Sequence, residues 1–288
     1  FLSTLKPPYV LKADGLAAGK GVIICQSLTE AKESLNTFFD GTFGEAGSKV
    51  VIEEFLHGIE VSVFALTDGK SYVLLPEAKD YKRVGEGDSG PNTGGMGAIS
   101  PVPFFNSTFK QKVEERIIQP TIKGLISEGI DYRGFIFAGL MNVNGEPYVI
   151  EYNARMGDPE TQVVMPRLKT DLLELFQLAA KQELHKAKIE YFDRTAAAVI
   201  LVSGGYPGSY TKGFEITGID NCDNAITFHA GTCTNQNGKL STSGGRVLAS
   251  VGIENNIAKA LNIAYTNAET IDFKGKYQTE TGPFRPMN

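Results

Sequence analysis

Short apolar runs alternate along the chain with longer stretches in which apolar residues recur three or four positions apart. The short runs predict strands, and the longer stretches predict amphipathic helices, because residues at that spacing line one side of a helix. Strands are therefore expected at residues 60–67, 71–76, 134–143, 147–151, 195–202, 225–229 and 245–253. Helices are expected at residues 28–39, 109–128, 171–184 and 256–268. This mixture of elements predicts an α+β fold.

The chain has 288 residues, which exceeds the length of one average domain. We expect a small, incomplete α+β lobe at residues 1–57, a larger lobe at 58–188 and a C-terminal α+β domain at 189–288. Residues 80–95 are too polar and too rich in Gly to form core, so they predict a long loop. A loop of this length inside a compact domain is usually either functional or disordered.

The apolar strand predicted at residues 147–151 is followed directly by polar and charged residues. Glu151 and Asn153 are two residues apart, so on a strand their side chains point to the same face. A carboxylate and an amide oxygen suit a hard cation such as Mg²⁺, which keeps water and phosphate oxygens as further ligands. Arg155 follows at the same spacing, and its planar guanidinium can brace an anion. The alternative is an ordinary edge strand with a polar exit.

A second motif near the start of the chain reads as strand, Gly-rich loop and strand. Gly15, Gly19 and Gly21 allow the backbone N–H groups of this loop to approach an anion closely. Lys12 ends the first strand, and Lys20 adds a positive charge at the tip of the loop. The spacing differs from the Walker A pattern, which continues into a helix. A plain hairpin turn with solvated lysines is the alternative interpretation.

A third motif joins two apolar strands through a short connector at residues 53–60. Its paired acids, Phe55 and Leu56 could hold an adenine ring through backbone groups and packing. Glu60 could bind ribose hydroxyls. A surface turn with solvated carboxylates remains the alternative.

Taken in their order along the chain, with the motif at Glu151 and Asn153 last, the three motifs resemble those of the ATP-grasp ligases, and most closely the phosphoribosylamine–glycine ligase (glycinamide ribonucleotide synthetase) family. Strings characteristic of that family occur at residues 12–21, 90–98, 153–162, 204–208, 229–232 and 244–248. The resemblance extends from about Tyr9 to about Lys276. It implies an ATP-grasp fold, with two α+β lobes around an ATP cleft, followed by a small C-terminal α+β domain.

The resemblance also implies an activity. A member of this family is an ATP-dependent carbon–nitrogen ligase of de novo purine biosynthesis. It joins glycine to 5-phosphoribosylamine through a glycyl phosphate and yields glycinamide ribonucleotide, ADP and phosphate. ATP and Mg²⁺ or Mn²⁺ are the implied cofactors, and residues 80–95 become a mobile lid over the substrates.

The same resemblance distributes roles among residues. The ATP-binding residues would be Lys12, Gly15, Gly19, Lys20, Gly21, Glu53, Glu54, Phe55, Leu56 and Glu60. The substrate-binding residues would be Asp80, Thr93, Gly94, Gly95, Met96, Arg155, Gly157 and Asp158. Of these, Asp80, Arg155 and Asp158 would be catalytic. Glu151 and Asn153 would bind the metal.

Three features depart from the family pattern. The chain opens at Phe1 and lacks the family's N-terminal α/β domain, so we expect it to be part of a longer protein that is inactive when truncated. The last residues, 277–288, do not continue the family's usual C-terminal strand. The strand at residues 134–141 carries no acid, which leaves few metal ligands.

Composition narrows the remaining functions. The net charge of −5 argues against general nucleic-acid binding, which usually shows a basic surface. Three cysteines without a paired spacing fit a reducing cytosol, and no apolar run approaches about 18 residues, the length of a membrane span. We expect a cytoplasmic monomer whose partners are the small molecules ATP, glycine and 5-phosphoribosylamine. The alternatives are an ATP-grasp ligase for another carboxylate and amine, and a non-catalytic nucleotide-binding fragment.

Overall fold

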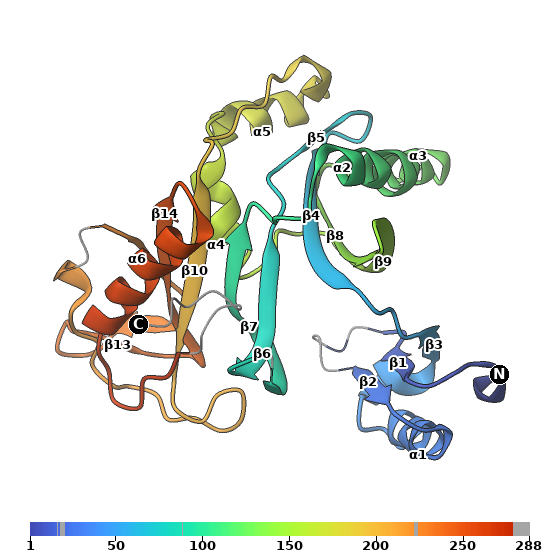
Figure 1. Ribbon diagram of the computed structural model, residues 1–288, viewed down its shortest axis with the longest axis horizontal. Helices are drawn as coiled ribbons and strands as arrows, with labels where there is room; N and C mark the ends of the chain where they lie inside the picture. The colour runs from blue at the N-terminus through green and yellow to red at the C-terminus, as the bar shows by residue number, and fades with distance from the viewer. Residues whose placement is uncertain (16, 18–20, 88, 222–223, 279–288) are drawn as a thin grey trace. The chain divides into compact units, whose positions relative to one another are not determined.

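The computed structural model describes residues 1–15, 17, 21–87, 89–221 and 224–278 (Figure 1). The chain forms two compact units, Phe1–Gly58 and Ile59–Asn288. Both units contain helices and antiparallel strands, so the predicted α+β fold is confirmed.

The first unit is a three-stranded antiparallel sheet with one helix. Its strands are β1 (Tyr9–Ala13), β2 (Val22–Cys25) and β3 (Val50–Glu54), in the order β2-β1-β3. Helix α1 (Leu28–Phe39) begins at Ser27, whose hydroxyl accepts a hydrogen bond from the backbone of Glu30 at 3.1 Å. Phe38 of α1 is buried with Leu11 of β1 in the core of this unit. Two short 3₁₀ helices, η1 (Leu2–Thr4) and η2 (Gly44–Ser48), complete the unit.

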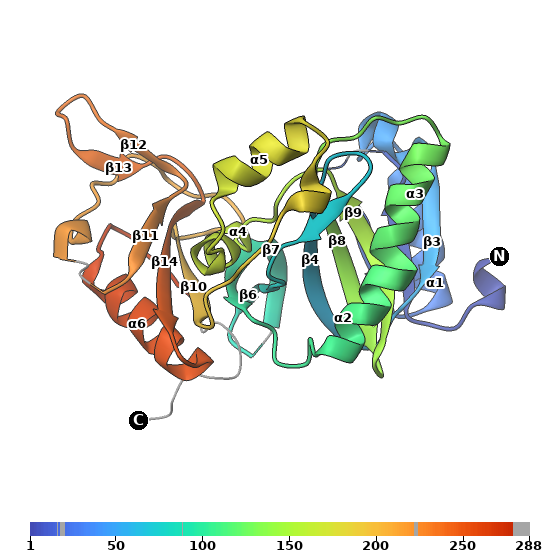
Figure 2. The same ribbon diagram turned by 90° about the horizontal axis from the view of Figure 1, so that it is seen from above.

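One sheet of the second unit has four antiparallel strands in the order β5-β4-β8-β9. They are β4 (Ile59–Thr67), β5 (Tyr72–Leu74), β8 (Gly134–Val143) and β9 (Glu146–Asn153). The helical stretch that covers this sheet in Figure 2 consists of α2 (Ser107–Val113), a π-helical turn (Glu114–Ile118) and α3 (Gln119–Ser127). Val113, Ile118 and Ile122 of this stretch pack with Val63 and Leu140 of the sheet.

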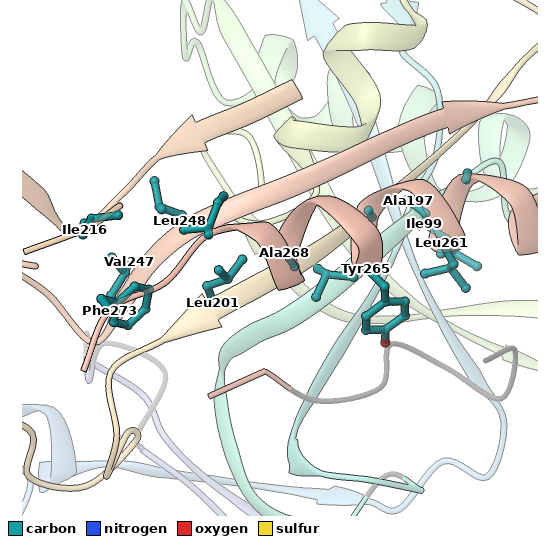
Figure 3. Close-up of a cluster of buried hydrophobic side chains, with 14 residues drawn as sticks. Ile99, Ala197, Leu201, Ile216, Val247, Leu248, Leu261, Tyr265, Ala268 and Phe273 are labelled. Atoms are coloured by element: carbon teal, nitrogen blue, oxygen red, sulfur yellow. The ribbon is translucent and has the colours of Figure 1, made fainter. Parts of the chain in front are cut away.

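The other large sheet of this unit has the strand order β11-β14-β10-β7-β6. Its strands are β6 (Lys79–Gly85), β7 (Ser89–Ser100), β10 (Thr195–Val202), β11 (Ile226–His229) and β14 (Arg246–Glu254). Helix α6 (Ile257–Thr270) packs on one face, where Leu261 and Tyr265 belong to the same buried cluster as Leu201 and Leu248 (Figure 3). Ala198 of β10 belongs to a second buried cluster on the opposite side. Every residue of β10 is buried, because both faces are covered.

The loop predicted at residues 80–95 is wrong, since most of this stretch belongs to the β6–β7 hairpin. Ala98 of β7 pairs with Asp80 on one side and with Ala198 of β10 on the other. Backbone pairing with β6 holds the Gly-rich first part of β7, and Met96, Ala98 and Ile99 bury the second part in the core. The Gly-rich composition therefore concealed a strand, because a strand ladder is built from backbone groups.

The five-stranded sheet joins two segments that we distinguished in the sequence. Strand β7 lies before residue 188 and strand β10 lies after it, yet they are hydrogen-bonded neighbours. Residues on both sides of that boundary consequently belong to one compact unit.

The other predicted elements agree with the structure apart from their ends. The helix predicted at 171–184 is α5 (Leu172–Ala180), and it ends early where Gln182 adopts a left-handed φ of 57°. The remaining elements are α4 (Thr161–Val164), η4 (Met165–Arg167), η5 (Leu184–Lys186), η6 (Ile219–Asn221), β12 (Thr232–Thr234) and β13 (Leu240–Thr242). Within the described ranges, no helix combines the length and the apolar character needed to cross a membrane.

Candidate active site

A group of charged side chains surrounds Lys82 in the second unit. Lys82 and Asp80 are two residues apart on β6, which places both side chains on the same face. The Nζ atom of Lys82 lies 2.5 Å from Oε2 of Glu60 on β4. Glu160 is only 3% exposed, and its Oε1 accepts a hydrogen bond from the hydroxyl of Ser62 at 2.8 Å. Four charged groups thus come together from β4, β6 and the start of α4.

The environment of this cluster shifts the pKa values of Asp80, Lys82 and Glu160. Burial raises the pKa of the Asp80 carboxyl, and the neighbouring Lys82 opposes this rise. The carboxylates of Glu160 and Glu60 reinforce it, and the resulting pKa is about 7. Burial also raises the pKa of Glu160, although its hydrogen bond with Ser62 opposes the rise. A carboxyl group that titrates near neutrality is suited to accept and return a proton at physiological pH.

Lys82 remains charged in this setting. Burial disfavours its ammonium form, but Asp80 and Glu60 outweigh burial and raise the pKa of Lys82 above its ordinary value. Glu151 of β9 contributes to the same rise, which links the predicted metal site to this cluster.

Glu151 and Asn153 lie side by side at the end of β9, as their spacing predicted. The Nδ2 atom of Asn153 donates to Oε1 of Glu151 at 3.3 Å, and both residues are accessible from outside. Among the described residues, no group of three or more His, Cys, Asp or Glu is placed to hold a metal ion. Two oxygen-bearing side chains fit an ion such as Mg²⁺, which takes the rest of its ligands from water and phosphate.

The predicted substrate-side residues of β7 are held mainly by their backbones. The Thr93 hydroxyl donates to the carbonyl oxygen of Lys82 at 2.8 Å and accepts from the Gly95 amide at 2.9 Å. The Gly94 amide donates to the Tyr206 hydroxyl at 2.9 Å. The side chain of Met96 is 1% exposed and packs in an apolar cluster, so only its backbone can face a substrate.

Asp158 lies in the turn that leads into α4, and protein donors occupy both of its carboxylate oxygens. Gln162 Nε2 donates to Oδ1 at 2.8 Å, and Arg246 Nη2 donates to Oδ2 at 2.7 Å. A Cβ atom at Gly157 would lie 2.4 Å from Glu160 Oε2, so a side chain at this position would require the Glu160 carboxylate to move. Arg155 is exposed, and its Nη1 donates to the carbonyl oxygen of Met156 at 2.9 Å.

The predicted ATP-binding residues before Gly58 lie in the first unit. Nζ of Lys12 on β1 is 2.6 Å from Oε2 of Glu53 on β3. The Gly15 amide donates to the carbonyl of Ala46 at 3.2 Å, and a Cβ atom at Gly15 would lie 2.6 Å from the Cα atom of Ala46. Gly21 directly precedes the return strand β2, and its carbonyl accepts from the Ala13 amide at 2.8 Å.

Two predicted residues of this loop, Gly19 and Lys20, lie outside the described residues. The connector predicted to hold adenine begins where β3 ends at Glu54, whose side chain is exposed. Phe55 and Leu56 are half-buried, and the Phe55 ring packs edge-on against His57 with 4.8 Å between ring centroids.

Sequence reasoning missed Lys82, Glu160, Tyr206 and Arg246. Lys82 follows Asp80 two residues later, a spacing that places both side chains on one face of a strand. Because this region was predicted to be a loop, the spacing was not used. Glu160 was read only as part of a family string, although a carboxylate three residues beyond Gly157 is close enough to face the same turn. Tyr206 and Arg246 are more than 100 residues from Gly94 along the chain, so no local pattern connects them.

Similarity to known proteins defines the class. The sequence matches the family "Phosphoribosylglycinamide synthetase, ATP-grasp (A) domain" over residues 1–161 and "Phosphoribosylglycinamide synthetase, C domain" over residues 196–279. The architecture is therefore an ATP-grasp fold with a C-terminal segment, as predicted. The chain belongs to the phosphoribosylglycinamide synthetase family.

Named relatives extend this comparison. The chain is 46% identical to the phosphoribosylamine–glycine ligase of Caldanaerobacter subterraneus subsp. tengcongensis over 278 residues, which are 96% of the chain and 66% of the relative. It is 47% identical to the enzyme of the same name from Pseudomonas syringae pv. tomato, covering 96% of the chain and 65% of the relative. The chain thus spans slightly less than two thirds of the length of these curated relatives.

Solved structures give the same result for the fold. The crystal structure of phosphoribosylamine–glycine ligase from Thermotoga maritima matches with a TM-score of 0.84 and 40% identity, covering 96% of this chain and 69% of that one. Biotin carboxylase from Campylobacter jejuni matches with a TM-score of 0.69 over 96% of this chain and 60% of that one, but at 13% identity it shows similarity of fold alone.

Proposed function

We propose that this protein joins glycine to 5-phosphoribosylamine in an ATP-dependent reaction that yields glycinamide ribonucleotide, ADP and phosphate. The observation that carries the proposal is the identity of 46–47% with curated relatives named phosphoribosylamine–glycine ligase, which extends over 96% of the chain. The titratable cluster around Lys82 supports it, because both halves of this reaction move negative charge and one of them moves a proton.

The chemistry follows from the poor reactivity of a carboxylate. A carboxylate oxygen of glycine attacks the γ-phosphorus of ATP, the bond to the β-phosphate oxygen breaks, and ADP leaves. The amine nitrogen of phosphoribosylamine then attacks the glycyl carbonyl carbon, phosphate leaves, and the nitrogen gives up a proton. Phosphoryl transfer of this kind depends mainly on positioning and on charge neutralisation.

On the nucleotide side, Lys12 and Lys20 would hold phosphate oxygens, and Gly15, Gly19 and Gly21 would shape the loop that covers them. The backbone at residues 53–56 would contact adenine, and Glu60 would bind ribose. The 2.6 Å pair between Lys12 and Glu53 supports the role of Lys12, because it holds the ammonium group of Lys12 at one end of β1.

On the acceptor side, Asp80 would take the proton that the attacking amine releases. Its pKa of about 7 supports this role, since a base with that pKa is effective near neutral pH. Thr93, Gly94, Gly95 and the backbone of Met96 would line the glycine and amine sites with Gly157 and Asp158. Arg155 would stabilise the transferring phosphoryl group or the glycine carboxylate.

Glu151 and Asn153 would hold Mg²⁺ or Mn²⁺ together with phosphate oxygens. A bound divalent ion neutralises charge on the phosphates during transfer. The electrostatic effect of Glu151 on Lys82 supports a metal site close to the proposed acceptor residues.

We further propose that the chain acts as a cytoplasmic monomer with segments 1–57, 58–188 and 189–288 as its functional parts. The β6–β7 hairpin would then cover the substrates during the reaction.

The test is ADP release by the longest natural form of the protein, with ATP, Mg²⁺, glycine and phosphoribosylamine, each omitted in turn. The proposal requires that ADP release depend on both glycine and the amine. If another carboxylate replaces glycine with higher kcat/KM, the substrate assignment falls. If ATP binds but no carboxylate supports turnover, the protein is a nucleotide-binding module.

A further inference from the structure

We propose that Arg246 and Tyr206 act together as positioning residues, locking the backbone of Gly94 and Gly95 against the turn at Asp158. This inference rests on the proposed function for its kinetic consequence, because those three residues belong to the proposed glycine and amine sites. It gives a role to two strings, residues 204–208 and 244–246, that the proposed reaction leaves without one.

Arg246 is the first residue of β14, and its guanidinium makes three hydrogen bonds to two separate segments. Nη1 donates to the carbonyl oxygen of Gly94 at 2.5 Å and to that of Asp158 at 2.9 Å. Nη2 donates to the Asp158 carboxylate at 2.7 Å. One rigid, planar group therefore sets the distance between β7 and the turn before α4.

Tyr206 holds the other side of the same peptide. Its hydroxyl accepts a hydrogen bond from the Gly94 amide at 2.9 Å, so protein groups satisfy both the N–H and the C=O of Gly94. The position of the Tyr206 ring depends on Gly245, because a Cβ atom there would lie 2.4 Å from the ring carbon Cδ2. Gly245 and Arg246 are consecutive, so a single short segment supports both contacts.

The backbone at Gly94 and Gly95 packs closely against the turn at Asp158, so a displacement of one segment would move the other. A Cβ atom at Gly95 would lie 2.3 Å from Cδ of Pro159, and one at Gly94 would lie 3.0 Å from Cζ of Arg246. Gly95 also adopts a φ of +116°, which side-chain-bearing residues rarely adopt. The backbone at Gly95 consequently touches the turn directly, and loss of the guanidinium would let the two segments separate.

The ion pair alone does not explain this arrangement. The Asp158 side chain is 55% exposed, and ion pairs with that much solvent access contribute little to stability. Two of the three bonds from Arg246 go to backbone carbonyls, which fixes geometry instead of balancing charge. We therefore expect removal of the Arg246 side chain to weaken the binding of glycine and of the amine, while the binding of ATP stays nearly unchanged.

The experiment measures amide hydrogen exchange and steady-state kinetics on the longest natural form of the protein. The variants are Arg246→Ala, Arg246→Lys and Tyr206→Phe, and Arg133→Ala is the matched control. Arg133 also pairs with an aspartate, with Nη2 2.8 Å from Oδ2 of Asp131, and donates to a backbone carbonyl, but it lies outside the proposed site. Exchange is followed at residues 92–97 and 157–162, with β8 as the internal reference.

We call the hydrogen bonds of Arg246 and Tyr206 to Gly94 and Asp158 the clamp. It predicts about tenfold faster amide exchange at Gly94 and Gly95 in Arg246→Ala, and about threefold faster exchange at Gly94 in Tyr206→Phe, with exchange in β8 unchanged. The KM for glycine should rise about tenfold in Arg246→Ala and rise less in Arg246→Lys. The KM for ATP should stay within about twofold of its wild-type value in both variants. The Arg133→Ala control should match wild type in every measurement.

Unchanged exchange at Gly94 in both Tyr206→Phe and Arg246→Ala would overturn the clamp, as would an equal rise of both KM values. If Arg246→Ala does not fold, Tyr206→Phe decides the question, because it removes only one hydroxyl. If the wild-type protein releases no ADP with glycine, the proposed ligase activity fails, and the exchange result alone then decides whether the clamp exists.

Discussion

Lys82 Nζ lies 2.5 Å from Glu60 Oε2, and this ion pair connects the four-stranded sheet to the five-stranded sheet of the second unit. The backbones of Ser62 and Ala78 exchange two hydrogen bonds close by, at 2.7 and 3.0 Å. The junction between the sheets is therefore also the place where Asp80 and Glu160 gather. A cation at this point balances carboxylates that would otherwise repel one another.

Replacing Lys82 with Met should destabilise the protein in a pH-dependent manner. At pH 8 Asp80, whose pKa is about 7, is mostly ionised, so losing the cation should lower the free energy of unfolding by about 1–2 kcal/mol. At pH 5 the loss should be smaller, because Asp80, whose pKa is about 7, then carries a proton. Urea denaturation at the two pH values measures the difference.

The matched control for that experiment is Lys186→Met. Lys186 is also ion-paired, with Nζ 2.6 Å from Oε1 of Glu183, but the pair is exposed and distant in sequence from the cluster. Its loss should change the free energy of unfolding by less than about 0.5 kcal/mol at either pH. Equal effects of the two substitutions would show that Lys82 does not neutralise the cluster.

The stability of the Asp80→Asn variant relative to wild type should increase as the pH rises. The folded protein holds the Asp80 proton up to about pH 7, whereas the unfolded chain releases it near its ordinary value of 3.8. Between these values the folded state binds more protons, so wild-type stability falls with increasing pH. Asn cannot ionise, and the stability difference in its favour should grow by about 2 kcal/mol from pH 5 to pH 8.

Thermal unfolding of wild type and Asp80→Asn at both pH values measures this change. The same variant should lose activity at pH 8, since it cannot accept a proton. A stability difference that is constant with pH would contradict the raised pKa of Asp80, whatever happens to the activity.

Glu151→Gln should reduce metal-dependent ADP release by about 100-fold or more, because one of two proposed side-chain ligands is lost. The comparison variant is Glu146→Gln on the same strand, where the carboxylate pairs with Lys112 and Arg116, each at 2.5 Å. Glu146→Gln should keep its activity. Titration of ADP release with Mg²⁺ and with Mn²⁺ distinguishes the two variants, and similar losses in both would argue against a metal role for Glu151.

Lys12→Met should raise the KM for ATP by about tenfold, since a charge-assisted contact to phosphate is lost. The KM for glycine should stay close to its wild-type value, because the role proposed for Lys12 is limited to the phosphates of ATP. Initial-rate measurements with each substrate varied in turn provide the test. A larger effect on glycine than on ATP would be inconsistent with the role proposed for Lys12.

Much of the fold followed from the periodicity of apolar residues, and the exceptions have physical reasons. Strand β10 was predictable because its eight residues are apolar or small and buried on both faces. Strand β6 and the first part of β7 were not, because most of their residues are polar or Gly and the backbone pairing between the two strands is not visible in the composition. The early end of α5 depends on the left-handed backbone of Gln182, which composition does not reveal.

In the candidate site, too, local spacing predicted some of the contacts and missed others. Spacing alone placed Glu151 and Asn153 next to each other, since a strand puts alternate residues on one face. The contacts of Glu160 with Ser62 and of Arg246 with Gly94 join residues 98 and 152 positions apart. Only the folded chain brings such residues together, so no local pattern could have predicted them.

The most direct test of the proposed reaction follows the oxygen atoms of glycine. With glycine labelled by ¹⁸O in its carboxylate, the reaction is run in unlabelled water with ATP and phosphoribosylamine, and the released phosphate is analysed by mass spectrometry. Activation through glycyl phosphate predicts one ¹⁸O atom in each phosphate, because the attacking carboxylate oxygen leaves with phosphorus. Phosphate without ¹⁸O would mean that water attacks ATP directly, and it would contradict ligation by this route.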